Sequence, residues 1–240
     1  METQIPTSEI TVRRSSERGL ADHGWLRSRH TFSFADYYDP AHMGFRSLRV
    51  INDDTVTAGQ GFPEHPHRDM EIFSYVLEGA LAHRDSLGNE RILTPGQIQL
   101  MSAGTGVRHS EFNPSATEST HFLQIWIQPR EAGLKPSYTE WHPSPSQGND
   151  PKVLVISPDG RDNSACIQQD TEIYRILLEA GQSIQHEVRP GRGLWIQMAE
   201  GSAELNGVTL QTGDAAAIEA SGTVTLFANS KSNALLFDLH

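Results

Sequence analysis

Residues 121–128 read HFLQIWIQ, in which every second residue from Leu123 to Ile127 is aliphatic and Pro129 ends the run. A period of two is typical of a β-strand, because successive side chains point to opposite faces. Asn206-Gly207 is typical of a two-residue hairpin turn. Sustained helical periodicity is scarce, so the sequence predicts an all-β protein. Comparable short runs lie at 45–51, 71–77, 153–157, 172–178, 193–199, 224–229 and 234–239.

These runs fall into two groups, on either side of a segment without periodicity. Residues 141–152 read WHPSPSQGNDPK, a Pro-, Ser- and Gly-rich composition that indicates a linker. Similar turn pairs occur at comparable places in the two halves, Glu78-Gly79 in one and Glu200-Gly201 in the other. We therefore expect an N-terminal domain over 1–140 and a C-terminal domain over 153–240, each a β-barrel or sandwich.

Composition excludes several classes of function. The chain has 240 residues, 37% of them hydrophobic, which is typical of a globular protein with a sizeable core. Its formal charge is −11, so direct binding to nucleic acid is not expected. No apolar run reaches the roughly 18–20 residues of a membrane helix, so no membrane association is expected. The single cysteine, Cys166, excludes an internal disulfide and, with an N-terminus that lacks a signal-peptide pattern, favours a cytoplasmic location.

Two pairs of residues carry the strongest chemical signal. His65 and His67 stand two residues apart in GQGFPEHPHRDME, and His109 and Glu111 stand two residues apart in MSAGTGVRHSE. In a strand, residues i and i+2 share a face about 6.5–7 Å apart, so each pair can converge on one cation. Two neighbouring strands would direct three imidazoles and one carboxylate into one barrel. This donor set suits one divalent transition metal, for which we expect Fe(II), with Mn, Ni, Cu and Zn as alternatives.

A second carboxylate competes for this site. Glu71 lies four residues after His67, and we place it on the same strand face. We favour Glu111 as the metal ligand and Glu71 as the carboxylate that orients a histidine N–H. We expect Trp126 to belong to the core. Isolated histidines, for which surface or hydrogen-bonding roles are expected, are His83, His121 and His142.

The same segments resemble a known family. Residues 59–79 read GQGFPEHPHRDMEIFSYVLEG and resemble the first cupin signature, with a glycine, five residues, His-x-His, three residues, Glu and a closing Gly. Residues 101–111 resemble the second signature as pirins carry it, with a terminal Glu. The segments 30–40 and 123–129 are also similar to pirins. The form HPHRDME resembles most the bacterial pirin-like proteins with quercetin 2,3-dioxygenase activity.

This resemblance implies a bicupin fold, two tandem antiparallel jelly-roll barrels with one metal in the N-terminal barrel. Carried over to this sequence, the implied ligands are His65, His67, His109 and Glu111, the four residues that the strand pattern also selects. The second half contains neither His-x-His nor His-x-Glu, so we expect the C-terminal barrel to be free of metal.

The resemblance also implies a function. It implies a metal-dependent dioxygenase that cleaves the heterocyclic ring of flavonols such as quercetin, with dioxygen as the second substrate. Glu111 would act as the general base for the flavonol 3-hydroxyl. We expect apolar side chains on inward strand faces, such as Phe73, to hold the flat ring. The alternative function is a metal- or redox-dependent protein partner of transcription regulators that has no dedicated substrate.

Overall fold

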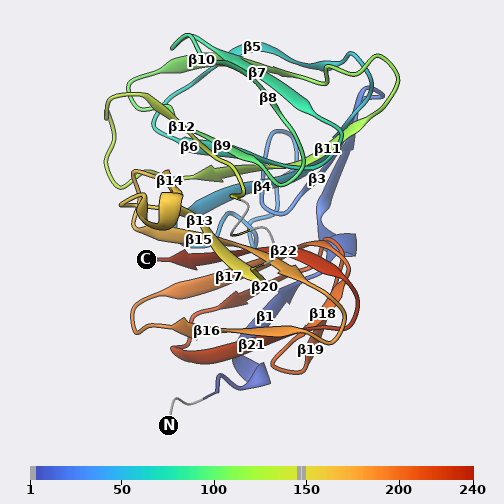
Figure 1. The fold of residues 1–240 in the computed structure, drawn as a ribbon, viewed down its shortest axis with the longest axis vertical. Helices are drawn as coiled ribbons and strands as arrows, with labels where there is room; N and C mark the ends of the chain where they lie inside the picture. The colour runs from blue at the N-terminus through green and yellow to red at the C-terminus, as the bar shows by residue number, and fades with distance from the viewer. Residues whose placement is uncertain (1–3, 145–146, 148–149) are drawn as a thin grey trace. The chain divides into compact units, whose positions relative to one another are not determined.

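The computed structural model describes residues 4–144, 147 and 150–240 (Figure 1). Apart from three short 3-10 helices, the regular elements in this part of the chain are β-strands, so the predicted all-β class is confirmed. The chain forms two compact units. The N-terminal unit comprises residues 19–143 and 158–169, and the C-terminal unit comprises residues 4–18, 150–157 and 170–240 with Ser144 and Gln147.

The N-terminal unit consists of two facing antiparallel sheets (Figure 1). The larger sheet has the strand order β12 (Ser137–Trp141), β9 (Ile98–Ser102), β6 (Glu71–Glu78), β11 (Thr120–Ile127), β4 (Leu48–Val56), β3 (Leu26–His30) and β2 (Gly19–Asp22). The smaller sheet has the order β5 (Gly61–His67), β10 (Val107–Phe112), β7 (Leu81–Asp85) and β8 (Glu90–Leu93). The 3-10 helix η3 (Arg161–Asn163) and the short strand β14 (Ala165–Cys166) also belong to this unit.

The C-terminal unit also consists of two antiparallel sheets. One has the order β1 (Ile10–Arg13), β20 (Ala215–Ile218), β17 (Gly193–Glu200), β22 (Ser232–Leu239), β15 (Thr171–Leu178) and β13 (Lys152–Ser157). The other has the order β16 (Ser183–Val188), β21 (Gly222–Ala228), β18 (Ser202–Leu205) and β19 (Val208–Gln211). The 3-10 helices η1 (Thr7–Glu9) and η2 (Ser15–Glu17) flank β1. Each unit therefore has the two-sheet arrangement of a jelly roll rather than one continuous ring of strands.

The bounds of the two units differ from the expected domains 1–140 and 153–240. Residues 4–18 join the C-terminal unit, because β1 pairs with β20 and Ile10 and Val12 pack against its apolar core. Residues 158–169 join the N-terminal unit. Of the expected linker 141–152, Trp141 ends β12 and Lys152 begins β13, while 145–146 and 148–149 lie outside the described residues.

The interiors of both units contain clusters of apolar side chains together with buried polar side chains. In the C-terminal unit, one large cluster of buried apolar side chains lies between the sheets, including Leu194, Leu226 and Leu236. Apolar clusters of the N-terminal unit include one around Val76 and Phe122 and one around Ile72 and Met101. This unit also buries polar side chains, including His83, His109 and Glu111.

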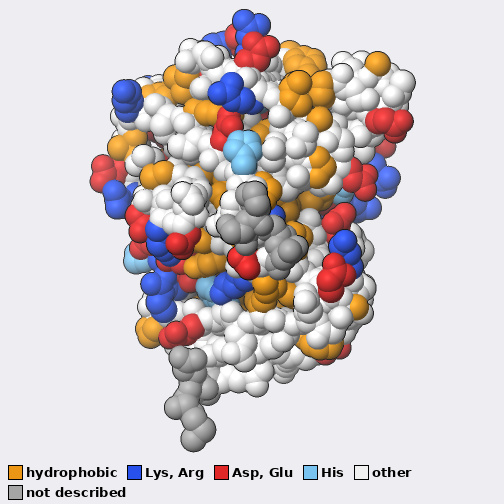
Figure 2. Space-filling model, viewed as in Figure 1, with side chains coloured by type: hydrophobic (Ala, Val, Ile, Leu, Met, Phe, Trp, Pro, Cys, Tyr) orange, Lys and Arg blue, Asp and Glu red, His pale blue; other side chains and the backbone are white. Residues whose placement is uncertain are grey.

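On the face shown in Figure 2, acidic and basic side chains are interspersed. Among the described residues, no helix combines the length and apolar character that crossing a membrane requires.

Candidate metal centre

Strands β5 and β10 bring three histidines together inside the N-terminal unit. His65 and His109 are direct partners in the antiparallel pairing of these strands, and His67 follows His65 by one pleat. The alternation that the sequence predicted holds on both strands. Glu64, Pro66 and Arg108 are exposed, His65 and His67 are half-buried, and His109 is buried. β5 is an edge strand, which accommodates Pro66 because that residue has no N–H to donate.

The three imidazoles converge through the same ring atom. The Nε2 atom of His109 lies 3.0 Å from that of His65 and 3.0 Å from that of His67. A first-row ion bonded to imidazole nitrogens at about 2.1 Å separates two neighbouring ligands by about 3 Å when the ligand–metal–ligand angle is about 90°. The spacing of the three nitrogens therefore fits a divalent transition metal with octahedral-type angles.

The charge state of the histidines also suits a metal. Burial, together with the nearby His109 and His65, lowers the pKa of His67 to about 4. Burial likewise lowers the pKa of His109, against the opposing effect of Glu111. Both imidazoles are therefore neutral at neutral pH, which is the form that binds metal ions.

Glu111 lies on the same face of β10 as His109. Its carboxylate belongs to a second group of possible metal ligands, which it forms with His83 and His109. Glu111 is 1% exposed. The Ser74 hydroxyl lies 2.9 Å from one carboxylate oxygen, and the Gln124 side-chain amide donates to the other. Burial alone would raise the pKa of Glu111, but His109, His83 and Ser74 outweigh that effect and lower it. Glu111 is therefore a carboxylate held ionised beside the three-histidine cluster.

An irregularity in the pairing of β5 with β10 separates Glu111 from the three-histidine cluster. His109 pairs with His65, whereas Glu111 pairs with Phe62, so β5 contains an extra residue in this interval. Such a bulge re-aims the side chains on either side of it. The bulge includes Pro63, whose carbonyl oxygen lies 2.8 Å from His65 Nδ1. This contact fixes the ring so that Nε2 faces the cluster.

His83 belongs to the site, although the sequence analysis treated it as isolated. It is 1% exposed, and its ring centroid lies 5.3 Å from that of His109. Its Nε2 atom lies 3.2 Å from Asp85, and its Nδ1 atom lies 2.9 Å from the Gln99 amide nitrogen. The spacing His83-x-Asp85 is the same i, i+2 pattern as His65-x-His67. The same rule could therefore have found it.

The placement of Glu71 was wrong. His67 ends β5 and Glu71 begins β6, because the chain turns between them at Asp69, whose φ is +49°. Glu71 is 2% exposed and accepts hydrogen bonds from the Ser102 hydroxyl at 2.6 Å and the Gln168 backbone N–H at 3.2 Å. These contacts make Glu71 an anchor between β6, β9 and the 158–169 segment.

Two aromatic residues also lie differently from expectation. Ser74 points toward Glu111, so the adjacent Phe73 points to the opposite face of β6 and does not line the site. Trp126, expected in the core, is half-buried, and its ring centroid lies 4.9 Å from that of His67. Trp126 therefore forms one wall of the site.

The remaining histidines have polar partners. His121 lies 2.7 Å from Asp53, and His142 lies 2.8 Å from Glu140, which fits the hydrogen-bonding roles predicted for them. In the C-terminal unit, the Nε2 atom of His186 lies 3.0 Å from Asp238.

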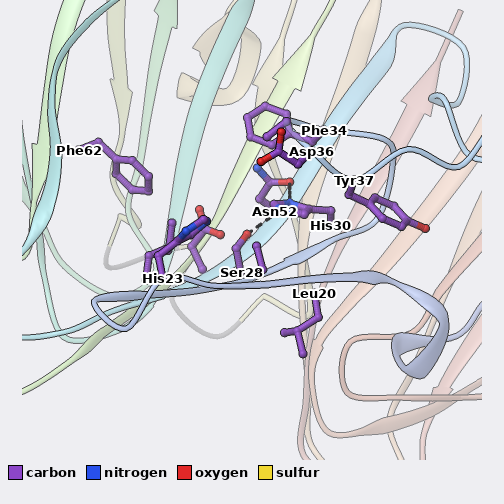
Figure 3. A pocket seen from close by; sticks show the side chains of 13 residues that line it. Leu20, His23, Ser28, His30, Phe34, Asp36, Tyr37, Asn52 and Phe62 are labelled. Carbon is purple, nitrogen blue, oxygen red and sulfur yellow. Dashed lines mark hydrogen bonds between the residues drawn. The ribbon is translucent and has the colours of Figure 1, made fainter.

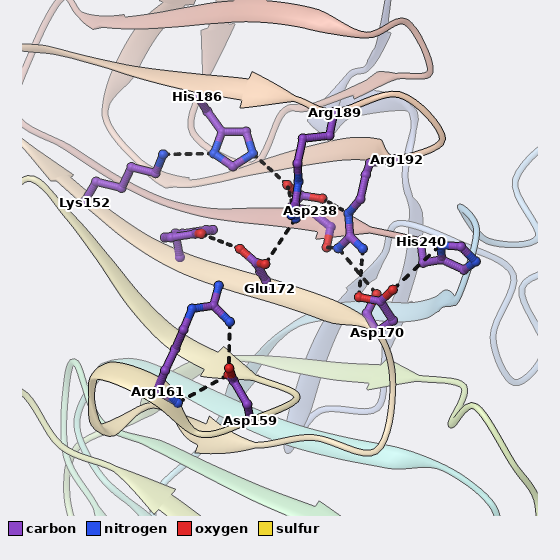
Figure 4. A network of polar contacts seen from close by, with 11 residues as sticks. Lys152, Asp159, Arg161, Asp170, Glu172, His186, Arg189, Arg192, Asp238 and His240 are labelled. Atoms are coloured by element: carbon purple, nitrogen blue, oxygen red, sulfur yellow. Dashed lines mark hydrogen bonds and ion pairs between the residues drawn. The ribbon is translucent and has the colours of Figure 1, made fainter.

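Figure 4 shows that this His186–Asp238 pair is part of a wider polar network. Lys152 lies 2.9 Å from the other ring nitrogen of His186, and Arg192 bonds both Asp238 and Asp170. Opposite charges thus neutralise one another within this cluster.

Comparisons with known proteins place the chain in a family. Residues 11–127 match the family model described as Pirin, and residues 154–239 match the one described as Quercetinase C-terminal cupin domain. A protein of Escherichia coli (strain K12) named quercetin 2,3-dioxygenase is 51% identical over 230 residues, which are 96% of this chain and 98% of that protein. The chain belongs to the pirin family.

Solved structures of another pirin have the same fold. The crystal structure of YhhW from Escherichia coli matches with a TM-score of 0.92 at 51% identity, over 96% of this chain and 97% of that one. The structure of bacterial pirin YhhW in complex with nickel(II) matches with a TM-score of 0.90 at 50% identity, over 96% of this chain and 98% of that one. Like those proteins, this pirin consists of two cupin-like domains, and metal binding is a property at the family level.

Proposed function

We propose that this pirin is a metal-dependent dioxygenase that opens the heterocyclic ring of flavonols such as quercetin, with loss of carbon monoxide. The observation that carries the proposal is the convergence of three imidazole Nε2 atoms, with that of His109 3.0 Å from each of the other two, beside the buried carboxylate of Glu111. The name of the relative with 51% identity supports the same reaction class. We propose Fe(II) as the native ion, because this mixed imidazole and carboxylate donor set suits a redox-active first-row metal.

His65, His67, His109 and Glu111 would hold the ion. When bound, it supplies a positive charge that stabilises the deprotonated 3-hydroxyl oxygen of a flavonol, and redox chemistry with dioxygen. Glu111 accepts the proton of that hydroxyl. Ser74 and Gln124 orient its carboxylate, and His83, its pairing partner on β7, lies on the side away from β5.

The surroundings suit a flat aromatic ligand. Trp126 packs against His67 and, with Phe34, Met70 and Val50, lines a cavity of about 310 Å³. Phe34 meets Trp126 edge to face, with ring centroids 5.4 Å apart. The cavity adjoins the metal centre through Trp126, and a largely apolar lining of this kind is common in small-molecule sites.

Elemental analysis and turnover test the proposal together. Protein purified without added metal is analysed for its metal content, reconstituted with Fe(II) without oxygen, and then given quercetin and dioxygen. We expect one ion per chain and equal consumption of quercetin and dioxygen, with release of carbon monoxide. A loaded protein that consumes no flavonol contradicts the proposal. A kcat/KM well below about 10⁴ M⁻¹s⁻¹ favours the protein-binding alternative.

A further inference from the structure

A second polar site lies in the N-terminal unit, beyond the metal centre. Residues from β2, β3, β4 and β5 and the loop before β4 line a cavity of about 310 Å³ (Figure 3). Its aromatic walls are Phe34, Tyr37 and Phe62, and its buried polar side chains are Ser28, His30, Asn52 and Asp54. The volume lies at the lower end of the range for ligand pockets, so it accommodates one substituted ring system.

Asp54 is the exceptional group in this cavity. Its side chain is 3% exposed, and its Oδ1 atom is buried without a hydrogen-bond partner. Burial raises the pKa of Asp54 to about 7, although a hydrogen bond from Ser28 acts in the opposite direction. A buried carboxylate oxygen without a hydrogen-bond partner lowers the free energy of unfolding. A ligand that donates a hydrogen bond to this oxygen would remove that penalty.

Asp54 stands next to a row of polar side chains that leads to the metal centre. His30 on β3 pairs in register with Asn52 on β4, Asn52 pairs with Gln124 on β11, and Gln124 pairs with Ser74 on β6. Directly opposed residues share one face of a sheet with their Cβ atoms about 4.5–5.5 Å apart.

Side chains at both ends of this row form hydrogen bonds. His30 Nδ1 lies 2.8 Å from Asn52 Oδ1, which Figure 3 shows within the cavity, and Gln124 donates to Glu111. Asn52 and Asp54 are two residues apart on β4, so both point to this face. The row therefore connects the wall of the cavity, at His30 and Asn52, with Glu111 at the metal centre.

We infer that this cavity is a specificity subsite for a hydroxylated aromatic ring, and that Asp54 accepts a hydrogen bond from a phenolic hydroxyl of the ligand. The choice of a flavonol as that ligand rests on the proposed function. Phe34 lines both this cavity and the one beside Trp126, so it links the subsite to the metal centre. The flat walls select a planar ring.

A neutral hydroxyl fits better than an ammonium group. Ser28 and Asn52, which also line the cavity, are uncharged, and a hydroxyl can pair with Asp54 whether that carboxyl is ionised or protonated. A site built around such a buried acceptor rejects an analogue that lacks the donor, because the acceptor then remains unpaired.

Binding without oxygen tests the inference independently of turnover. Metal-loaded protein is titrated under argon with quercetin and with 3-hydroxyflavone, which has no hydroxyls on its two outer rings. We expect the wild type to bind quercetin at least tenfold more tightly than 3-hydroxyflavone, and Asp54→Ala to remove most of that preference. Asp54→Asn, which keeps the shape of the side chain, should give an intermediate loss. The matched control is Asp53→Ala, because Asp53 points to the other face of β4 and contacts His121.

Each outcome of these titrations is decisive. Metal content and circular dichroism show whether each variant has folded. If Asp54→Ala has not folded, Asp54→Asn alone is compared with the wild type. A wild type that shows no preference for quercetin, or an Asp54 variant that retains the preference, overturns the inference, as does tighter binding of an arylmethylammonium probe. If quercetin binds with the expected preference but is not consumed when oxygen is admitted, the proposed reaction fails and the subsite stands.

Discussion

The Nε2 atom of His67 lies 3.0 Å from the Nε2 atom of His109, although 42 positions separate the two residues in the chain. Both rings are buried or half-buried, and the pKa of each is lowered. Two neutral imidazoles that face each other through one nitrogen leave room for a shared cation. This pair, with His65, is the centre of the predicted metal site.

Removal of the central histidine should abolish metal binding. The Nε2 atom of His109 lies close to those of both His65 and His67. His109→Ala therefore removes the imidazole at the centre of the cluster. We expect the metal content of the purified protein to fall at least tenfold by mass spectrometric elemental analysis. The matched control is His142→Ala, which removes a half-exposed imidazole bonded to Glu140 and should retain the metal. Equal metal content in both variants would refute this ligand assignment.

Metal removal should lower the stability of the protein. An ion that binds only the folded state adds about 2.7 kcal/mol to the free energy of unfolding at one hundred times its Kd. Chelation should therefore lower Tm, and added Fe(II) without oxygen should restore it, as calorimetry would show. The His109→Ala variant supplies the control, since its Tm should not respond to chelator. A response of that variant equal to the wild type would place the ion elsewhere.

The role of Glu111 as a base can be separated from its role as a ligand. Glu111→Gln preserves the shape of the side chain and a hydrogen bond with Ser74 but cannot accept a proton. We expect much of the metal to remain and kcat for quercetin to fall by about 10² or more. Ser74→Ala, which removes contacts that orient Glu111 and Gln124 but leaves the carboxylate in place, should cost less. Turnover by Glu111→Gln at the wild-type rate would eliminate Glu111 as the base.

Asp54 should give stability a distinctive dependence on pH. Because burial raises its pKa to about 7, the folded protein binds more protons than the unfolded chain between about pH 4 and pH 7. The free energy of unfolding therefore falls as pH rises through this window, by up to about 1.4 kcal/mol per pH unit. The difference in Tm between Asp54→Asn and the wild type should be larger at pH 8 than at pH 5. The exposed control Asp150→Asn should show the same Tm difference at both pH values.

Local sequence could predict the strands and the converging pairs. The side-chain period of a strand is two, so His65 with His67, and His109 with Glu111, share faces wherever their strands lie. Asn206-Gly207 forms the predicted turn between β18 and β19, and both residues have positive φ, 46° and 88°. These features depend only on neighbours within a few positions.

Other features depend on where the chain turns and which strands pair. Glu71 could not be placed correctly, because the turn at Asp69 moves it from the strand of His67 to β6. The membership of β1 in the C-terminal unit follows from its pairing with β20, more than 200 positions away. Such pairings are decided by the burial of whole faces, which no short stretch of sequence contains.

The sequence by itself determined an all-β chain with two inward-facing donor pairs, because strand periodicity is a local property of the backbone. Tertiary structure alone decided that His83 lies beside His109, that Ser74 and Gln124 hold Glu111, and that Asp54 lacks a partner for one oxygen, although the spacing His83-x-Asp85 already marked His83 as a candidate. The physical reason is that hydrogen bonding and burial of a polar group depend on the strands packed around it, and packing brings together residues from distant parts of the chain.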